Sequence, residues 1–272
     1  MKFLRIILLL SMVLYFSGFS GNHHPFASSS SLSVTREMQT GEEIVYLVKY
    51  AFIKLGELKL VILEKKQKDK ETYYRTKVYI DSYSGIPFVD IHQIFESNFS
   101  TGQYSLFFRA TEKEKNYIKF TDYTFDYAKN KVYVKKGKYN PYQIWADSSA
   151  KINAKFQDGL SIFYFARMNT GQKKFVKVPC FVTEKFESMS INFYNTIENI
   201  SIDAVDYNIP CVKLDGNTTF RGVYGLTGEF EGWFTNDKYA VPTIAKMHVY
   251  IGSVSVELKR WKKQGWKPPQ AN

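Results

Sequence analysis

The chain has 272 residues, enough for one large domain or two small ones, and its 20 tyrosines and 22 phenylalanines, with many Val, Ile and Thr, favour β-sheet. Its net charge of +11 suits anionic partners such as lipid head groups or acidic glycans, but a lysine-rich surface that only keeps the protein soluble is the simpler explanation. The two cysteines lack CxxC spacing, which argues against a dithiol redox motif and a zinc knuckle.

The N-terminus has the pattern of a secretory leader. A basic start at Lys2 and Arg5 precedes a mostly apolar run over residues 6–19, and small and polar residues follow. The pattern predicts a signal peptide over residues 1–27, a flexible linker over 28–40 and export to the periplasm or the outer membrane. A retained N-terminal anchor is the alternative, because the run is only slightly short of a membrane span. Since exported proteins rarely meet nucleic acid, no nucleic-acid partner is expected.

The first half of the chain is a succession of predicted strands. Over residues 44–52 apolar and aromatic side chains occupy every second position, the period of a strand with one buried face. A turn at residues 54–57 and a second alternating run predict a hairpin over 44–63. Further strands are predicted at residues 73–80, 89–97, 103–111, 117–127 and 131–136.

The period changes at residues 158–167, where the spacing i, i+3, i+4, i+7 predicts the one helix of the chain. Asp158 is its expected N-cap, and Gly171 follows its expected end. The residues that share the predicted face are Leu160, Phe163, Tyr164 and Arg167.

Strands resume after the helix and continue to the C-terminus. They are predicted at residues 173–185, 186–194, 198–203 and 209–214, followed by a long β-rich stretch over 222–258. Within that stretch the apolar positions switch from odd to even numbers at Gly252. Because a regular strand keeps one phase, either a β-bulge at Gly252 or a loop between two short strands is expected there.

The predicted fold is all-β and mainly antiparallel, a curved sheet that forms a partly open barrel with one short helix. No long Pro, Gly or Ser linker interrupts the chain after residue 40, so residues 41–261 are expected to form one β domain. Residues 262–272 form a basic tail. The stretch over residues 259–267 combines Lys and Trp, so the tail either contacts a membrane surface or is solvated.

Three segments of the mature chain resemble one family. The motifs Gly-Glu-Glu-Ile-Val-Tyr at 41–46, Asp-Gly-Leu-Ser-Ile-Phe-Tyr-Phe-Ala-Arg at 158–167 and Gly-Glu-Phe-Glu-Gly-Trp-Phe at 228–234 are similar to those of the DUF3108 family of exported bacterial proteins. Gly159 stands where that family often has proline. The resemblance implies export, a periplasmic or outer-membrane-facing location and a curved β fold. It implies no catalytic residues.

One polar cluster is a candidate site. Asp90, His92 and Glu96 share a strand face if residues 89–97 are extended, which suits a metal or proton-transfer site, although a half-exposed polar face explains the same pattern. No catalytic residue, metal or cofactor is predicted from these residues.

Two further predictions concern Arg167 and the two cysteines. Arg167 lies on the apolar face of the predicted helix, where it either anchors the helix to the sheet or contacts an anion at the mouth of a cavity. Cys180 and Cys211 form a disulfide in an oxidising compartment or stay as two buried thiols on separate strands.

These observations predict a non-enzymatic exported protein of the cell envelope that binds an apolar or amphiphilic ligand, a lipid or lipid-linked glycan, on its curved sheet. The sequence does not identify the ligand-binding residues. The alternative is a structural or assembly factor of the envelope that binds a protein partner through a sheet edge. An envelope glycan or lipid hydrolase is less favoured, because no catalytic constellation stands out.

Overall fold

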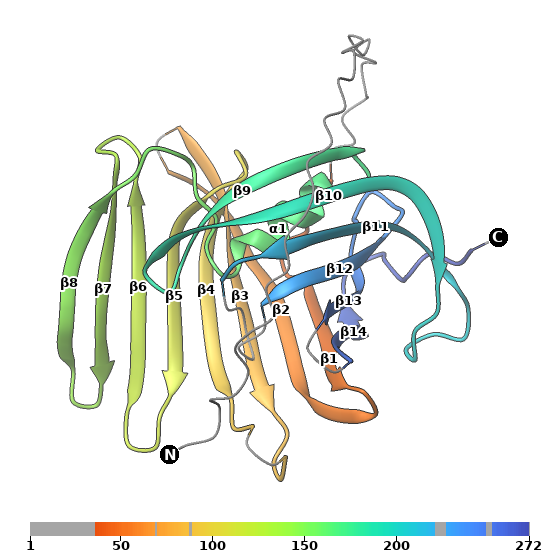
Figure 1. The fold of residues 1–272 in the computed structure, drawn as a ribbon, viewed down its shortest axis with the longest axis horizontal. Helices are drawn as coiled ribbons and strands as arrows, with labels where there is room; N and C mark the ends of the chain where they lie inside the picture. Colours follow the sequence, from red (N-terminus) through yellow and green to blue (C-terminus); the bar gives the residue numbers. More distant parts are fainter. Residues whose placement is uncertain (1–35, 69, 87–88, 221–226, 249–251, 272) are drawn as a thin grey trace, which may run out of the picture. The chain divides into compact units, whose positions relative to one another are not determined.

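The computed structural model describes residues 36–68, 70–86, 89–220, 227–248 and 252–271. These residues form one sheet of fourteen strands and one helix, α1 (Ser161–Asn169) (Figure 1). The strands are β1 (Glu43–Tyr50), β2 (Ile53–Lys68), β3 (Glu71–Ser82), β4 (His92–Ser100), β5 (Ser105–Lys113), β6 (Ile118–Asp126), β7 (Lys131–Tyr139), β8 (Gln143–Lys151), β9 (Lys174–Val182), β10 (Lys185–Ile200), β11 (Ile209–Thr218), β12 (Gly228–Thr235), β13 (Pro242–His248) and β14 (Ser253–Lys262).

The sheet is antiparallel, curved and not closed, which confirms the predicted fold class. The strand order is β8-β7-β6-β5-β4-β3-β2-β1-β14-β13-β12-β11-β10-β9. Neighbouring strands in this order follow one another in the chain, except at the centre, where β1 pairs with β14. The two free edges are therefore β8 and β9, the strands on either side of α1 in the sequence.

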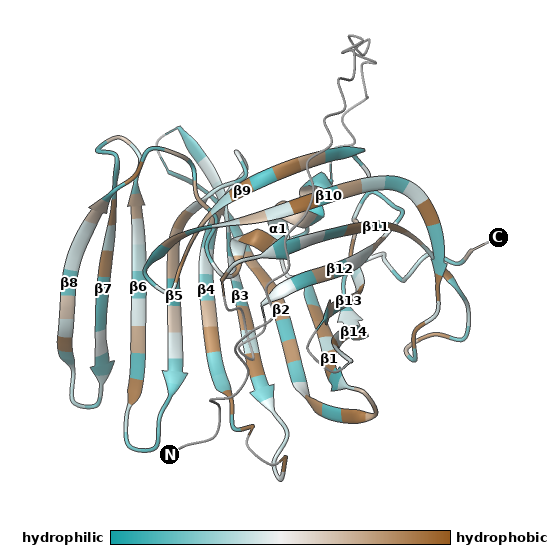
Figure 2. Cartoon of the chain, in the orientation of Figure 1, coloured by the Kyte–Doolittle hydropathy of each residue, from teal (hydrophilic) through white to brown (hydrophobic). Residues whose placement is uncertain are grey.

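Alternating burial follows from the two-residue period of the strands. In β3, Tyr74, Thr76, Val78 and Ile80 are buried, and the residues between them are only half-buried. Figure 2 shows hydrophobic and hydrophilic residues alternating along the strands. The buried set belongs to the face that packs against α1, which we call the inner face.

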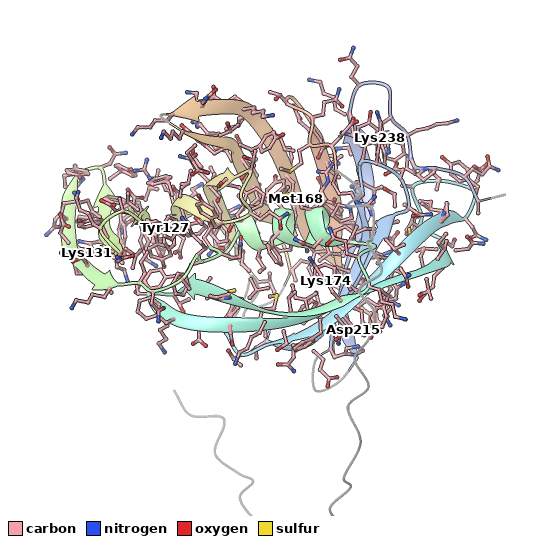
Figure 3. All side chains as sticks on the ribbon, turned by 90° about the horizontal axis from the view of Figure 1, so that it is seen from above. Tyr127, Lys131, Met168, Lys174, Asp215 and Lys238 are labelled. Carbon is pink, nitrogen blue, oxygen red and sulfur yellow. The ribbon has the colours of Figure 1, made fainter. Side chains whose placement is uncertain are left out.

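Helix α1 joins two apolar clusters on the inner face. Leu160 and Tyr164 pack with Phe99 of β4 and other residues of β2–β7, and the rings of Tyr164 and Phe99 stack with centroids 6.0 Å apart. Ile162, in the first turn of α1, packs with residues of β9–β12. Figure 3 shows α1, marked by Met168, lying between the strands of the two halves of the sheet. The helix thus fills the space between them with side chains.

The helix begins three residues later than predicted, yet Asp158 still fixes its start. Asp158 Oδ1 accepts hydrogen bonds from the backbone N–H groups of Leu160 and Ser161, both at 2.7 Å, and Ser161 Oγ accepts one from the Asp158 N–H at 2.8 Å. Asp158 Oδ2 accepts from the hydroxyls of Ser97 at 2.6 Å and Ser105 at 2.5 Å. One buried carboxyl therefore joins α1 to β4 and β5.

Several strand predictions differ from the structure. The turn predicted at residues 54–57 lies within β2, and the hairpin turns at residues 51–52 instead. β8 lies where no strand was predicted, because its residues are mostly exposed on both faces and show no apolar period. The separate strands predicted at 186–194 and 198–203 are one strand, β10, whose register shifts between Phe193 and Ile197.

Of the two readings of the phase change at Gly252, the structure shows two short strands joined by a loop and not a β-bulge. β13 ends at His248, β14 begins at Ser253, and these two residues pair across an antiparallel hairpin. The chain reverses there, which explains why the apolar positions change phase, and Gly252 has a φ of 78°.

Described residues at both ends of the chain pack onto the sheet. Arg36, in the segment expected to be a flexible linker, donates hydrogen bonds to the carbonyl oxygens of Asp237 at 2.6 Å and Thr170 at 2.7 Å. In the basic tail, the Trp266 indole donates to Asp237 Oδ2 at 2.7 Å, and the Lys263 side chain is buried. The predicted signal peptide lies outside the described residues. Within the described part of the chain, no helix has the length and hydropathy needed to cross a membrane.

Candidate ligand-binding groove

The turn between β9 and β10 crosses to the other half of the sheet. Thr183 and Glu184 have φ values of 49° and 58°, a conformation that costs free energy in residues other than glycine. Contacts hold the turn in place: the Glu184 N–H donates to the Tyr123 hydroxyl of β6 at 3.3 Å, and the Glu184 carboxylate pairs with Lys136 of β7 at 2.7 Å. The hairpin therefore docks on the inner face at β6 and β7 and leaves β8 uncovered.

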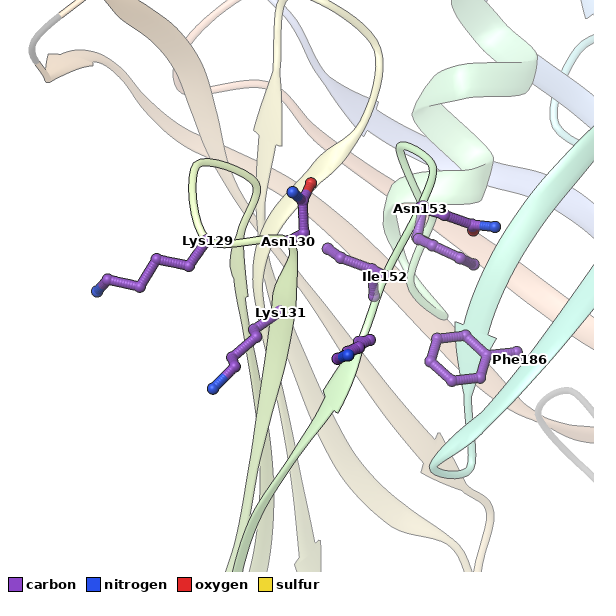
Figure 4. Close-up of a pocket in the computed structure, with 8 residues that line it drawn as sticks. Lys129, Asn130, Lys131, Ile152, Asn153 and Phe186 are labelled. Carbon is purple, nitrogen blue, oxygen red and sulfur yellow. The ribbon is translucent and has the colours of Figure 1, made fainter.

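A groove of about 880 Å³ lies where this hairpin meets the ends of β7 and β8. Figure 4 shows Phe186 of β10 on one side of the gap and Ile152, just after β8, on the other. The Phe186 ring is half exposed and contacts the buried rings of Phe156 and Phe181, with centroids 5.4 and 5.1 Å away. The residues that line the groove are Lys129, Asn130, Lys131, Lys151, Ile152, Asn153, Phe156 and Phe186.

The rim of the groove is positively charged. Lys131 of β7 and Lys151 of β8 are directly paired across the two strands, where like charges repel. Neither forms an ion pair with a described residue, whereas Lys129 pairs with Asp126 at 3.1 Å. Both lysines alternate with residues of the inner face, so they lie on the outer side of the sheet. The groove thus runs from a cationic outer rim to an apolar inner wall.

The polar cluster predicted around His92 is only partly assembled. His92 Nδ1 lies 2.9 Å from Asp81 Oδ1 on β3, and His92 Nε2 lies 3.3 Å from Asp90 Oδ1, with all three side chains exposed. Glu96 instead pairs with Lys77 at 3.1 Å. His92 and Asp81 line a second open groove of about 620 Å³. Among the described residues no group of His, Cys, Asp and Glu is arranged to hold a metal ion.

Arg167 is a buried anchor in this structure. Its Nη1 and Nη2 donate to the two carboxylate oxygens of Glu42, the second at 2.9 Å, and its Nε donates to the Tyr239 carbonyl at 2.7 Å. Lys263 donates to Glu42 Oε2 at 2.6 Å. Burial alone would raise the pKa of Glu42, but the two cations outweigh it and lower that pKa. Each nitrogen of the guanidinium donates to a group of the protein and the side chain is buried, which is the arrangement expected of an anchor between the helix and the sheet.

The two cysteines are free, so the disulfide considered from the sequence is not formed. Strand β10 lies between β9, which carries Cys180, and β11, which carries Cys211. The thiols also belong to different apolar clusters. Burial raises the pKa of each thiol to about 12. Cys180 and Cys211 are therefore two buried thiols on separate strands, which is the alternative to a disulfide that the sequence left open.

The comparisons with known proteins agree with this fold. A model of the DUF3108 family, described as a protein of unknown function, matches residues 45–259. The chain belongs to the DUF3108 family. Comparison with the curated proteins finds no match to the sequence of this DUF3108 chain.

A solved structure is similar to the DUF3108 fold. It is the crystal structure of a β-barrel-like protein with the domain of unknown function DUF1849 from Brucella abortus, with a TM-score of 0.52 and 10% sequence identity. The likeness covers 81% of this chain and 96% of the Brucella chain. At this identity the likeness concerns the fold alone.

Sequence reasoning did not find the groove of the DUF3108 chain. Phe186 was placed on a strand and Lys131 at the start of one, but nothing in the local pattern brings them together. The one local signal is the excess of lysine over acidic residues around residues 129–151, because such an excess near strand ends marks a cationic rim.

Proposed function

We propose that this protein is a non-enzymatic, exported cell-envelope protein that binds an amphiphilic ligand, a lipid or lipid-linked glycan, in the groove between β8 and the β9–β10 hairpin. The anionic head would lie against Lys131 and Lys151, and the apolar part against Ile152, Phe156 and Phe186. The observation that carries this proposal is the groove's division into a cationic rim and an apolar wall.

The packed inner face supports this location. Side chains of the sheet and of α1 fill it in three buried clusters, with Phe99 and Leu160 fully buried. A ligand within the curve of the sheet would have to displace them, at a cost of several kcal/mol. The groove between β8 and the β9–β10 hairpin offers apolar surface to a ligand without displacing buried side chains.

Binding without catalysis is also part of the proposal. The two groups that suggested proton transfer or anion chemistry have partners within the protein. His92 bridges Asp81 and Asp90 at an exposed position, and Arg167 is buried and bonded to Glu42 and to the Tyr239 carbonyl. An envelope glycan or lipid hydrolase is therefore the less favoured reading.

Native mass spectrometry of the full chain with lysophosphatidylglycerol tests the groove. We expect a 1:1 complex, and about tenfold weaker binding of lysophosphatidylcholine with the same acyl chain, because its head carries no net negative charge. Phe186→Glu should weaken binding about tenfold, since it places a carboxylate against the apolar wall.

The matched control is Phe175→Glu, which changes a phenylalanine of β9 that is also exposed and lies outside the groove. It should bind the lipid as the unaltered protein does. If circular dichroism shows both variants to be folded and they bind the lipid with equal affinity, the ligand does not bind in the groove.

Export is tested separately by the mass of the mature chain after expression in a bacterial host. We expect a new N-terminus between about residues 20 and 28, at the small residues that follow the apolar run. An intact N-terminus in the cytoplasmic fraction would contradict export without bearing on the groove.

A second function, binding of a protein partner, is favoured by one observation. Strand β8 is paired on one side only among the described strands.

A further inference from the structure

The two edges of the sheet differ in how well they are protected. On β9, Pro179 lacks an N–H group, and Gln157 covers the edge by donating to the Pro179 carbonyl at 2.9 Å and accepting from the Phe181 N–H at 2.8 Å. Lys177 is exposed on the same strand. Proline, lysine and a covering segment are devices that keep an edge from pairing with other chains.

Strand β8 has none of these devices along its centre. It is nine residues long, contains no proline, and has a single lysine at its last position. Its neighbour in the sheet is β7, and no other described strand pairs with it. Trp145 and Ile144 are exposed, with 43% and 37% of their surface accessible. A row of backbone N–H and C=O groups is thus open to an incoming strand.

The charge around β8 indicates what kind of strand fits. Residues 126–151 contain six lysines and two aspartates, a net charge of +4. Lys131, Lys138 and Lys151 form no ion pair with a described residue, and they lie at the two ends of β8: Lys138 is opposite Gln143, and Lys131 is opposite Lys151. A second copy of this chain would bring an equal positive charge against them.

We propose that β8 is a docking site for an extended acidic segment of another protein, which pairs with it as an added strand. The backbone of β8 supplies the hydrogen bonds, Lys138 and Lys151 receive acidic side chains at the two ends, and Ile144 and Trp145 receive apolar ones. This site is separate from the apolar wall of the lipid groove, although it shares Lys151 with the rim of that groove.

The test is a fluorescence titration of the full chain with a labelled nine-residue peptide that has two Glu residues at each end and Val between them, so that each end presents a carboxylate on both faces of the added strand. We expect saturable 1:1 binding that weakens with added salt. A peptide with Lys in place of Glu should bind at least about tenfold more weakly, because its charge repels β8. A peptide with the same side chains but alternate N-methylated backbone amides should be weakened at least about tenfold too, because it cannot pair as a strand.

Variants and hydrogen exchange locate the binding. Lys138→Glu should weaken the acidic peptide about fivefold to tenfold, and Lys177→Glu on β9 should leave it unchanged within about twofold. The bound peptide should slow amide exchange in residues 143–151. Neither variant touches the groove, and Phe186→Glu should leave peptide binding intact, so the two proposals fail independently.

Three results would overturn the proposal: no binding at millimolar peptide, binding that survives N-methylation, or protection of residues 174–182 in place of 143–151. A concentration-dependent dimer that slows exchange at β8 in the absence of peptide would show that a second copy occupies the edge, and would overturn it as well.

Discussion

At the scale of single residues, the network around Glu42 is a buried cluster of one acid and two cations. Glu42 and Arg167 are each 3% exposed, and the Lys263 side chain is fully buried. These residues come from the segment before β1, from α1 and from the segment after β14, and Arg167 also bonds the Tyr239 carbonyl between β12 and β13. Removing the one acid would leave two buried cations without a counter-charge, which is far more costly than losing an exposed ion pair.

We therefore predict that Glu42→Gln lowers the free energy of unfolding by about 3–5 kcal/mol. Urea denaturation followed by circular dichroism measures the change. Glu37→Gln is the matched control, because Glu37 pairs with Lys238 at an exposed position, and it should change stability by no more than about 0.5 kcal/mol. Similar losses in both variants would contradict the role given to burial.

The pKa of Glu42 also sets a pH dependence. Because its pKa in the folded state lies below its ordinary value of 4.5, its contribution to stability is complete above that value and is lost as the pH falls through the folded pKa. Between pH 7 and pH 3 the urea midpoint should fall more steeply in the unaltered protein than in Glu42→Gln. Asp158 is present in the unaltered protein and in Glu42→Gln, so its titration affects the urea midpoints of both in the same way. If the urea midpoints of the two proteins fall equally with pH, the pKa of Glu42 is not lowered in the folded state.

At the scale of elements, the sequence predicted those strands that bury one face. β1 and β3 show clear alternation because one side of each packs against the inner clusters. β8 escaped prediction because Gln143, Ser148 and Ser149 place polar side chains on both faces of an exposed edge. Helix α1 was recognised from its spacing, but its exact start depends on the bonds that Asp158 makes to Ser97 and Ser105, more than fifty residues earlier in the chain.

The Asp158 contacts predict the effect of removing that carboxyl. Asp158→Ala should lower the free energy of unfolding by about 2–4 kcal/mol, because it removes the acceptor of two backbone N–H groups and two hydroxyls. Asp203→Ala, which removes an exposed partner of Lys49, is the control and should cost no more than about 1 kcal/mol. Thermal and urea denaturation measure both. A loss below about 1 kcal/mol in Asp158→Ala would contradict the joint it forms between α1 and the sheet.

At the scale of the whole molecule, the features that decide the candidate sites come from contacts between distant segments. The groove exists because the β9–β10 turn reaches Tyr123, 61 residues earlier in the chain. The same arrangement leaves β8 exposed. Local periodicity carries no information on contacts between distant segments. The sequence therefore predicted a partly open barrel, but not the groove between β8 and the β9–β10 hairpin or the residues that line it.

The separation of the two thiols gives a prediction at this scale. In the native protein Cys180 and Cys211 should not react with a thiol reagent at neutral pH, because both are fully buried and their pKa values are about 12. Both should react after unfolding in urea without reductant, and a reductant should not change the unfolding midpoint. An intact mass lower by two hydrogens, restored by reductant, would show a disulfide instead.

The pairing of β1 with β14 has a consequence for the order of folding. The centre of the sheet joins residues about 210 positions apart, so β1 has no partner on that side until the last strand has been made. At roughly 5–20 residues per second, ribosomal synthesis leaves this strand waiting for about 10–40 s. During that interval β1, with five consecutive buried residues in the finished sheet, is an open edge in the middle of an incomplete structure. A nascent chain of this kind requires either a late collapse, after release, or a chaperone that covers β1 until β14 arrives.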